Sequence, residues 1–216
     1  MARAGGAVLP FSGSMHFPDA RLYLLFTPEL CAGDPWQALA DALTAGVDLV
    51  QWRVKSVDRD GYERCRTICR DARVPLVVND DVMLAVRSRV AGAHVGQGDM
   101  PHDAARKLLV GQWLGVSTHD PAQIRSAVAA GADYLGFGPC HPTPTKGYTV
   151  GKSAAEVEAA VAAAATARTP LFAIGGITVE NLLPLRRLGI DRIAVSSAIL
   201  GAADPAAAAR ELRRML

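Results

Sequence analysis

The chain has 216 residues, of which 50% are hydrophobic and 20% charged, as in an ordinary globular domain. Its formal net charge of +2 is too small to attract nucleic acid or a membrane surface through the overall field, so we expect neither partner. No apolar run approaches the ~20 residues that a membrane-spanning helix needs, and the four cysteines show no disulfide pattern, which favours a cytoplasmic protein.

Eight short apolar runs follow one another along the chain, and polar or glycine clusters end them. Before them, residues 1–20 are rich in glycine, serine and proline, so we expect a disordered lead-in there and one domain over 21–216. Continuous apolar runs are typical of buried parallel strands. The predicted strands are Leu22–Thr27, Leu49–Arg53, Pro75–Val78, Ala93–Val95, Leu114–Ser117, Tyr134–Gly138, Leu171–Ile174 and Arg192–Val195.

Segments with helical spacing separate these runs. The predicted helices are Pro35–Ala45, about 58–72, 81–91, Pro101–Leu109, Pro121–Ala130, Ser153–Thr166, Val179–Leu188 and Pro205–Arg214. Strands that alternate with helices indicate βαβ units, and eight such units close into a barrel. We therefore expect an α/β fold, a single (β/α)₈ TIM barrel, with its active site at the C-terminal ends of the strands.

Polar side chains end the second predicted strand. Gln51, Arg53 and Lys55 alternate along the chain, so in a strand they point to the same side. Two of them are cationic, and burying a cation without a ligand is costly. We expect an anion site here at the barrel mouth. A charged rim that only contacts water is the alternative.

Carboxylates follow the third and fourth predicted strands. Asp81, after Asn79 and Asp80, is expected to start a helix, where the helix dipole favours negative charge. Asp80 and Asp99 stand at the ends of neighbouring strands. Mg²⁺ binds one or two carboxylates and completes its shell with water and substrate phosphate. The pattern predicts a Mg²⁺ site at Asp80 and Asp99, with two capping residues as the alternative.

The loop after the sixth predicted strand is about fifteen residues long, against the usual two to six. It contains three prolines and offers the hydroxyls of Thr143 and Thr145 and the ammonium group of Lys146. Prolines reduce the entropy lost when such donors are held around an anion. Ser117, at the end of the fifth predicted strand, adds a further polar group beside them.

Small residues follow the last two predicted strands: Gly175 and Gly176 after the seventh, and Ser196 and Ser197 after the eighth. These are the loops where such barrels commonly bind phosphate through exposed backbone amides. The pattern predicts a monophosphate site, with tight packing turns as the alternative. A monophosphate site together with the cationic site suits two phosphorylated substrates, or one substrate that carries two phosphate groups.

Other reactive side chains have simpler interpretations. His94 lies inside a predicted strand, and we expect a core histidine whose hydrogen bonds are satisfied. The cysteines are expected to be buried thiols. Cys140 and His141 could be a thiol nucleophile and its base, but adjacent residues do not generally face one another, so we do not favour this interpretation.

The chain resembles the thiamine phosphate synthase family in motifs that occur in the family's order from about Leu22 to Leu200. The matching segments are Val50–Lys55, Val78–Asp81, His94–Asp99, Gly115–His119, Gly131–Gly136, Pro142–Lys146 and Ala173–Ile177. The resemblance implies a transferase that joins hydroxymethylpyrimidine diphosphate to a thiazole phosphate and releases pyrophosphate. The reaction would pass through a stabilised pyrimidine-methyl cation and needs no protein nucleophile. A homo-oligomer is compatible with the resemblance.

The resemblance also implies residue roles. The pyrimidine diphosphate would be bound by Gln51, Arg53, Lys55, Asn79, Ser117 and Lys146. The thiazole phosphate would be bound by Thr143, Thr145, Gly176, Ser196 and Ser197. Asp80 and Asp99 would hold Mg²⁺. The residues expected to assist departure of the diphosphate are Lys146, Arg53, Lys55 and Ser117.

Three features depart from the family pattern. Val54 replaces a usual Glu, Cys140 and His141 replace two apolar residues, and the segment between Lys55 and Val74 is short. A thiazole tautomerase on the same barrel, or a non-catalytic thiamine-phosphate-binding barrel, is therefore an alternative function. The Asp80 and Asp99 pair favours the synthase, because neither alternative is expected to keep a metal site directed at a leaving group.

Overall fold

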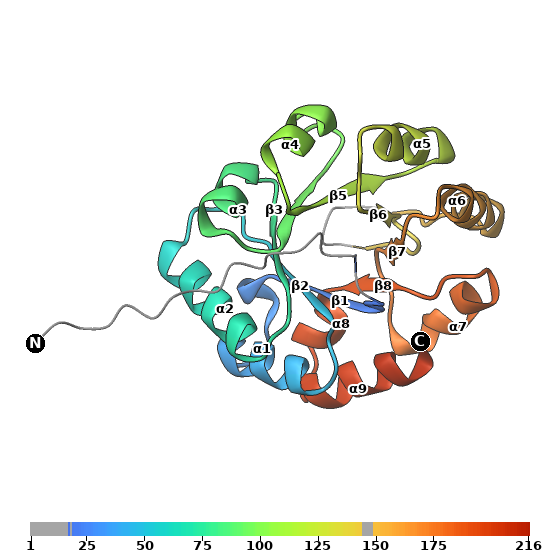
Figure 1. The fold of residues 1–216 in the computed structure, drawn as a ribbon. Helices are drawn as coiled ribbons and strands as arrows, with labels where there is room; N and C mark the ends of the chain where they lie inside the picture. Colours follow the sequence, from blue (N-terminus) through green and yellow to red (C-terminus); the bar gives the residue numbers. More distant parts are fainter. Residues whose placement is uncertain (1–16, 18, 144–148) are drawn as a thin grey trace, which may run out of the picture.

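The computed structural model describes residues 17, 19–143 and 149–216. Eight parallel strands form one closed barrel in sequential order. They are β1 (Leu22–Phe26), β2 (Leu49–Trp52), β3 (Leu76–Asn79), β4 (Gly92–Val95), β5 (Trp113–Thr118), β6 (Tyr134–Phe137), β7 (Leu171–Ile174) and β8 (Ile193–Val195). Helices alternate with these strands and form an outer ring around them (Figure 1). The predicted (β/α)₈ barrel is confirmed.

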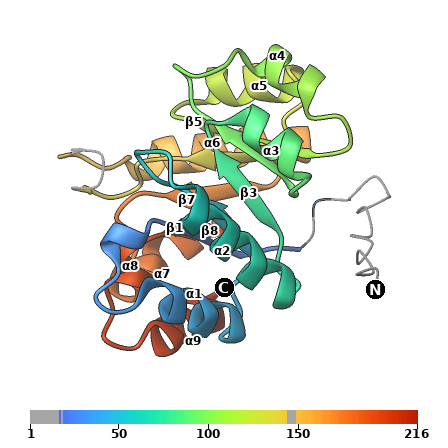
Figure 2. The same cartoon turned by 90° about the vertical axis from the view of Figure 1, so that its left-hand side faces the viewer.

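The ring contains every helix that the sequence pattern predicts. The helices are α1 (Pro35–Thr44), α2 (Arg59–Asp71), α3 (Val82–Ser88), α4 (His102–Leu108), α5 (Pro121–Ala129), α6 (Ala154–Ala167), α7 (Val179–Arg187) and α9 (Pro205–Met215). Two unexpected turns, η1 (Pro28–Leu30) and α8 (Ser197–Leu200), are too short to show a helical period. Helices α1 and α9 lie side by side, which joins the first and last units (Figures 1 and 2).

Aspartate side chains cap the N-termini of many of the helices. Oδ1 of Asp81 accepts a hydrogen bond of 2.8 Å from the backbone N–H of Leu84, which confirms the predicted helix start. The same contact to a first-turn amide is made by Asp34, Asp58, Asp120 and Asp204. Such caps satisfy amides that have no partner within the helix. No helix in the described part of the chain has the length and apolar character needed to cross a bilayer.

Alternating strand side chains separate two apolar cores. One core lies between the strands and the helices and includes Cys65 and Cys69, which are buried as predicted, whereas Cys31 is only half-buried. The other lies inside the barrel, and its members include Tyr23, Leu49, Val77, Trp113, Tyr134 and Phe172. The barrel is therefore filled, and a ligand can enter only at its ends.

The end of the lead-in packs against the barrel. The ring centroid of Phe17 lies 4.9 Å from that of Trp113, 4.8 Å from that of Tyr134 and 5.9 Å from that of Phe172. Ala20 is buried. The expectation of a disordered lead-in up to residue 20 is thus wrong for Phe17 and Ala20, because an aromatic ring here covers apolar surface inside the barrel. Residues 1–16 and 18 lie outside the described part.

Two aspartates hold the N-terminal ends of strands. Oδ2 of Asp48, just before β2, accepts hydrogen bonds from the backbone N–H groups of Arg21 at 2.8 Å and Leu22 at 2.9 Å. Asp133, just before β6, accepts one from the backbone N–H of Leu114 at 2.7 Å. Both residues belong to the repeated Ala-Gly-X-Asp segment. These contacts lie at the end of the barrel opposite to the C-terminal ends of the strands.

Candidate active site

One cavity lies at the C-terminal ends of the strands, as predicted. Its empty space, including the open solvent at its mouth, is about 1050 Å³. Eight of the predicted site residues line it: Gln51, Arg53, Asn79, Ser117, Thr143, Gly176, Ser196 and Ser197. Residues 100 or more positions apart in the sequence therefore share one cavity.

Lys55, Asp80 and Asp99 do not line this cavity, and all three are exposed. Strand β2 ends at Trp52, and the backbone N–H of Arg53 donates a last hydrogen bond of 3.0 Å to the carbonyl of Phe26. Beyond that bond the chain leaves the sheet, so the expected alternation does not extend to Lys55. Thr145 and Lys146 lie outside the described residues.

Asp80 has an unusual backbone conformation directly after β3. Its φ angle of 62° lies in the left-handed region, which Asp and Asn adopt more readily than most residues. Its backbone N–H donates to the carbonyl of His94 at 2.8 Å, and its Oδ2 accepts from Nδ2 of Asn79 at 2.6 Å. Such a conformation persists only where neighbouring contacts maintain it. The Asp80 carboxylate is thus held at the edge of β3 and β4.

Asp99 belongs to the turn after β4. Its Oδ2 accepts a hydrogen bond of 2.7 Å from the backbone N–H of Gly96, two residues after His94 in the chain. Within the described residues, no three His, Cys, Asp or Glu side chains form a group that could hold a metal alone. Two carboxylates suit Mg²⁺ only when phosphate and water complete its shell. A metal held by this pair would therefore need the phosphate of a ligand, and water, as its further ligands.

Gly176 lies close to the neighbouring backbone in the cavity wall. Its φ angle is 60°, and an added Cβ would lie 3.0 Å from Cβ of His141 and closer still to the carbonyl of Pro142. The backbone N–H of His141 donates to the carbonyl of Gly175 at 3.0 Å, which holds the two loops together. Only glycine combines this conformation with this spacing. Gly176 therefore lines the cavity without a side chain, in the loop where the monophosphate is predicted.

The serines after β8 differ in their roles. Oγ of Ser196 donates a hydrogen bond of 2.8 Å to the carbonyl of Leu25 on β1, which ties the loop to the barrel wall. Ser197 is exposed and is the first residue of α8. Both side chains line the cavity beside Gly176. The two loops named in the phosphate prediction are thus brought together.

Cys140 has the environment of an unreactive thiol. It is buried, its Sγ lies 3.5 Å from the carbonyl of Phe137, and burial raises its pKa to about 12. A thiol nucleophile must instead reach the thiolate form near neutral pH. The structure thus supports the preference for a structural cysteine over a nucleophile paired with His141.

Comparisons with known proteins identify the family. A family model described as thiamine monophosphate synthase matches residues 22–199. The chain belongs to this family. A thiamine-phosphate synthase from Bacillus velezensis is 36% identical over 208 residues, which cover 89% of this chain and 91% of that protein. Another, from Chloroflexus aurantiacus, is 39% identical over 206 residues, covering 93% and 94%. Family membership makes the chain an enzyme, a transferase of thiamine biosynthesis.

A solved structure supports the same grouping. The thiamine phosphate pyrophosphorylase from Pyrococcus furiosus matches this chain with a TM-score of 0.80 and 28% sequence identity. The match covers 91% of this chain and 95% of that protein. The resemblance to this family that the motifs indicate is therefore confirmed, and so is its barrel fold.

This member of the thiamine monophosphate synthase family has cavity residues that the sequence analysis did not assign to the site. His94 is buried, with Nε2 2.9 Å from Oγ of Ser117 and Nδ1 3.3 Å from the hydroxyl of Tyr134. The prediction of a satisfied core histidine is confirmed, but His94 also lines the cavity. Tyr23 lines it too and accepts a hydrogen bond of 2.6 Å from Nε2 of Gln51. Tyrosines within apolar runs look like core residues in a sequence.

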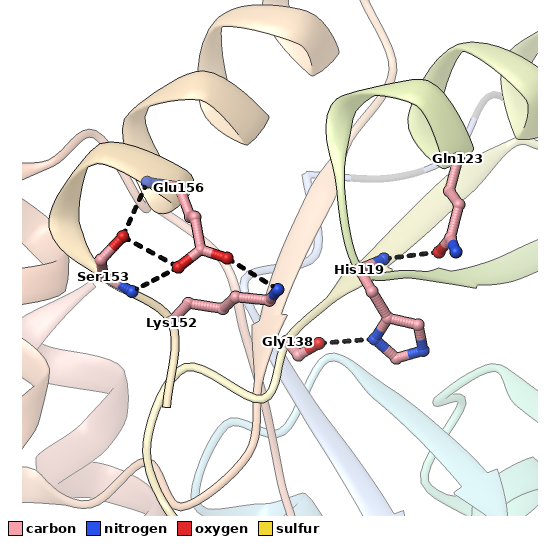
Figure 3. Close-up of polar contacts among 6 residues, drawn as sticks. All are labelled: His119, Gln123, Gly138, Lys152, Ser153 and Glu156. Atoms are coloured by element: carbon pink, nitrogen blue, oxygen red, sulfur yellow. Dashed lines mark hydrogen bonds and ion pairs between the residues drawn. The ribbon is translucent and has the colours of Figure 1, made fainter. Parts of the chain in front are cut away.

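His119 is another cavity residue outside the predicted set. Its Nδ1 lies 2.6 Å from the carbonyl of Gly138, and its backbone N–H donates to Oε1 of Gln123 at 2.8 Å (Figure 3). Because a carbonyl oxygen can only accept, Nδ1 must carry a proton. In the neutral ring, Nε2 is therefore the hydrogen-bond acceptor.

A charged cluster holds the start of α6, after the long loop. Ser153 and Glu156 form a reciprocal capping box, and Nζ of Lys152 donates to Oε1 of Glu156 at 2.9 Å (Figure 3). The hydrogen bond from the backbone of Ser153, followed by that from Lys152, lowers the pKa of Glu156 to about 2. The ionised carboxylate is therefore favoured in the folded protein.

We expect Glu156→Gln to lower the melting temperature near pH 7. A carboxyl whose pKa is lowered on folding adds stability above its ordinary pKa, 4.5, and loses it as the pH falls towards 2. The difference between wild type and variant should therefore shrink between pH 4.5 and pH 2. Thermal unfolding followed by circular dichroism across this range measures it. Glu158→Gln, at an exposed position of the same helix, is the control. A difference independent of pH would contradict this role of the charge.

Proposed function

We propose that the chain is a thiamine-phosphate synthase. It joins 4-amino-2-methyl-5-(diphosphooxymethyl)pyrimidine to a thiazole phosphate and releases pyrophosphate. The observation that carries this proposal is the single cavity with two different polar walls. Gln51, Arg53 and Ser117 line it at the ends of β2 and β5, whereas Gly176 and the two serines line it after β7 and β8. Two walls of this kind suit two phosphorylated substrates, and relatives with this name support the assignment.

The chemistry needs charge stabilisation and orientation. The bond between the pyrimidine methylene carbon and the diphosphate oxygen breaks, and its electron pair leaves with the diphosphate. The resulting cation then accepts the lone pair of the thiazole nitrogen, which forms the new carbon–nitrogen bond. Donors placed around the departing oxygens lower this barrier, and a fixed thiazole phosphate orients the nucleophile. Arg53, which is half-buried in the cavity wall, can supply positive charge.

Asp80 and Asp99 would hold Mg²⁺ against the diphosphate. The ion would supply positive charge to the leaving group. The proposal assigns Lys55 and Lys146 to the same diphosphate, and Thr143 and Thr145 to the thiazole phosphate, on the basis of the family resemblance. The position of Asn79 supports the proposal, because Asn79 lines the cavity and its Nδ2 donates a hydrogen bond to Oδ2 of Asp80.

The test is an assay of the purified protein with both substrates and Mg²⁺. We expect thiamine phosphate and pyrophosphate to form in equal amounts, with no product when either substrate is omitted. Mass spectrometry for the first product and a phosphate assay after pyrophosphatase for the second measure them. Isomerisation of the thiazole phosphate without the pyrimidine would support the tautomerase instead. Binding of thiamine phosphate without any turnover would support the non-catalytic barrel.

A further inference from the structure

A continuous set of hydrogen bonds crosses the barrel interior and has both ends at the cavity. Nε2 of Gln51 donates to the hydroxyl of Tyr23 at 2.6 Å, and this hydroxyl lies 3.1 Å from that of Tyr134. The Tyr134 hydroxyl lies 3.3 Å from Nδ1 of His94, whose Nε2 lies 2.9 Å from Oγ of Ser117. Gln51 and Ser117 line the cavity, whereas Tyr134 is fully buried behind it.

Two glycines leave the space that these side chains occupy. An added Cβ on Gly115 would collide with the ring of Tyr134 and would lie 2.5 Å from Nδ1 of His94. An added Cβ on Gly136 would lie 3.3 Å from Cε1 of His94. The interior of β5 and β6 is therefore shaped around these polar groups. A polar chain buried in this way is costly unless each member has its partner, so the direction of its hydrogen bonds is constrained.

The direction follows from counting protons. Each tyrosine has one hydroxyl proton, and burial raises the pKa values of Tyr23 and Tyr134 above the usual range, so both keep it. Since Tyr23 accepts from Gln51, its own proton is directed to Tyr134. Tyr134 in turn donates to Nδ1 of His94. The ring proton of His94 then sits on Nε2 and is donated to Ser117.

The two residues at the ends of this hydrogen-bonded series consequently offer different groups to a ligand, one an acceptor and the other a donor. Ser117 accepts from His94, so its hydroxyl proton remains to be donated into the cavity. Gln51 uses its amino group on Tyr23, so its Oε1 is the amide atom that it offers as an acceptor. If the hydrogen bond at one end changes direction, every hydrogen bond between Gln51 and Ser117 must change direction as well. The acceptor at Gln51 and the donor at Ser117 are thus set together.

We propose that Tyr23, Tyr134 and His94 are positioning residues that make the site select an aminopyrimidine over the corresponding oxopyrimidine. This inference rests on the proposed function. An exocyclic amino group donates to Oε1 of Gln51, whereas an oxo group at the same place presents a second acceptor. To bind the oxo compound, the Gln51 amide must reverse, and Ser117 then loses its donor direction. Sites that hydrogen-bond a specific group discriminate strongly against analogues that leave their partners unpaired.

The decisive variant is Tyr134→Phe, which removes one hydroxyl from a residue outside the cavity lining. Without Tyr134 as its acceptor, Tyr23 can turn its proton onto the Gln51 amide, which can then reverse. We expect wild type to prefer the 4-amino over the 4-oxo pyrimidine diphosphate by about 100-fold or more in kcat/KM. In Tyr134→Phe the preference should fall to about 10-fold or less. Tyr62→Phe, a buried tyrosine of the outer core, is the matched control and should keep the wild-type preference.

The outcomes separate the possible failures. A Tyr134→Phe enzyme that loses activity equally on both pyrimidines would show a merely structural tyrosine and overturn the inference. A wild-type enzyme without synthase activity would instead overturn the proposed function. A second measurement needs no substrate: ¹⁵N NMR of the histidine rings should show His94 neutral with its proton on Nε2. The signal is assigned by its loss in His94→Gln. A proton on Nδ1 would mean that these hydrogen bonds run in the opposite direction, and would contradict the inference.

Discussion

Replacing Asp80 or Asp99 with alanine should lower kcat by about 100-fold to 1,000-fold. Each substitution removes a carboxylate that the proposal assigns to Mg²⁺, so the ion that would neutralise the negative charge of the departing diphosphate is bound less tightly. Removing one preorganised electrostatic contact to a developing charge commonly costs a factor of this size. Both residues are exposed, so the fold should survive, although alanine at position 80 also strains the left-handed backbone. Steady-state kinetics and thermal unfolding of the purified variants measure the two effects.

Matched substitutions separate metal binding from local structure. Asp80→Asn retains a side chain that tolerates the left-handed backbone at φ 62° but removes the charge, so it should behave like the alanine variant. Asp81→Asn is the control, because Asp81 already caps α3 and asparagine is also a good cap. Calorimetric titration of Mg²⁺ in the presence of pyrophosphate provides a readout besides turnover. Full activity of wild type in excess chelator, or unchanged Mg²⁺ binding in Asp80→Asn, would refute the assignment.

The second large effect is expected at Gly176. In Gly176→Ala the new Cβ would meet the Pro142 carbonyl, and the left-handed φ of 60° is strained for alanine. The loop must therefore shift, and the amide presented to the phosphate shifts with it. We expect the affinity for thiazole phosphate to fall at least about tenfold, whereas that for pyrimidine diphosphate stays near the wild-type value.

Isothermal titration calorimetry with each substrate alone measures this pattern. Gly33→Ala is the control, because nothing lies within 4 Å of a Cβ at that position. Thermal unfolding of both variants shows how much of the effect is general destabilisation. The opposite pattern, with pyrimidine diphosphate affinity lost and thiazole phosphate affinity kept, would place the monophosphate elsewhere than at the loops after β7 and β8.

The sequence predicted the barrel well because its signals are local. Every strand lies in a largely apolar run, and a polar or glycine residue near its end marks the edge where side chains meet. Gln51 and Arg53 could therefore be assigned to the cavity wall from their positions alone. The position of Lys55 could not be predicted in this way. The point where strand hydrogen bonding ends depends on the partner strand, and not on the alternation of side chains along β2. Phe17 was likewise missed, since its partners on the barrel interior come much later in the chain.

The hydrogen bonds inside the barrel could not be predicted from the sequence either, because their partners also lie far apart in the chain. Tyr23 and Gln51 are 28 positions apart, and Tyr23 and Tyr134 are 111 apart. Each tyrosine fits its apolar run, and only closure of the barrel places the hydroxyls against one another. The binding, catalytic and metal-holding roles of all the predicted site residues stay predictions, because they depend on ligands that meet these residues in the bound enzyme.

The aspartates before β2 and β6 bear on how the substrate specificity of this enzyme can be altered by substitution. Asp48 and Asp133 hold strand starts through backbone hydrogen bonds, and Arg213 and Arg106 pair with them at 3.1 Å and 2.8 Å. All of these contacts lie at the end of the barrel remote from the cavity. Laboratory evolution of substrate choice can therefore vary the loops at the mouth while the residues that secure the strand starts remain untouched. New specificities should be reachable on this barrel with little loss of folded protein.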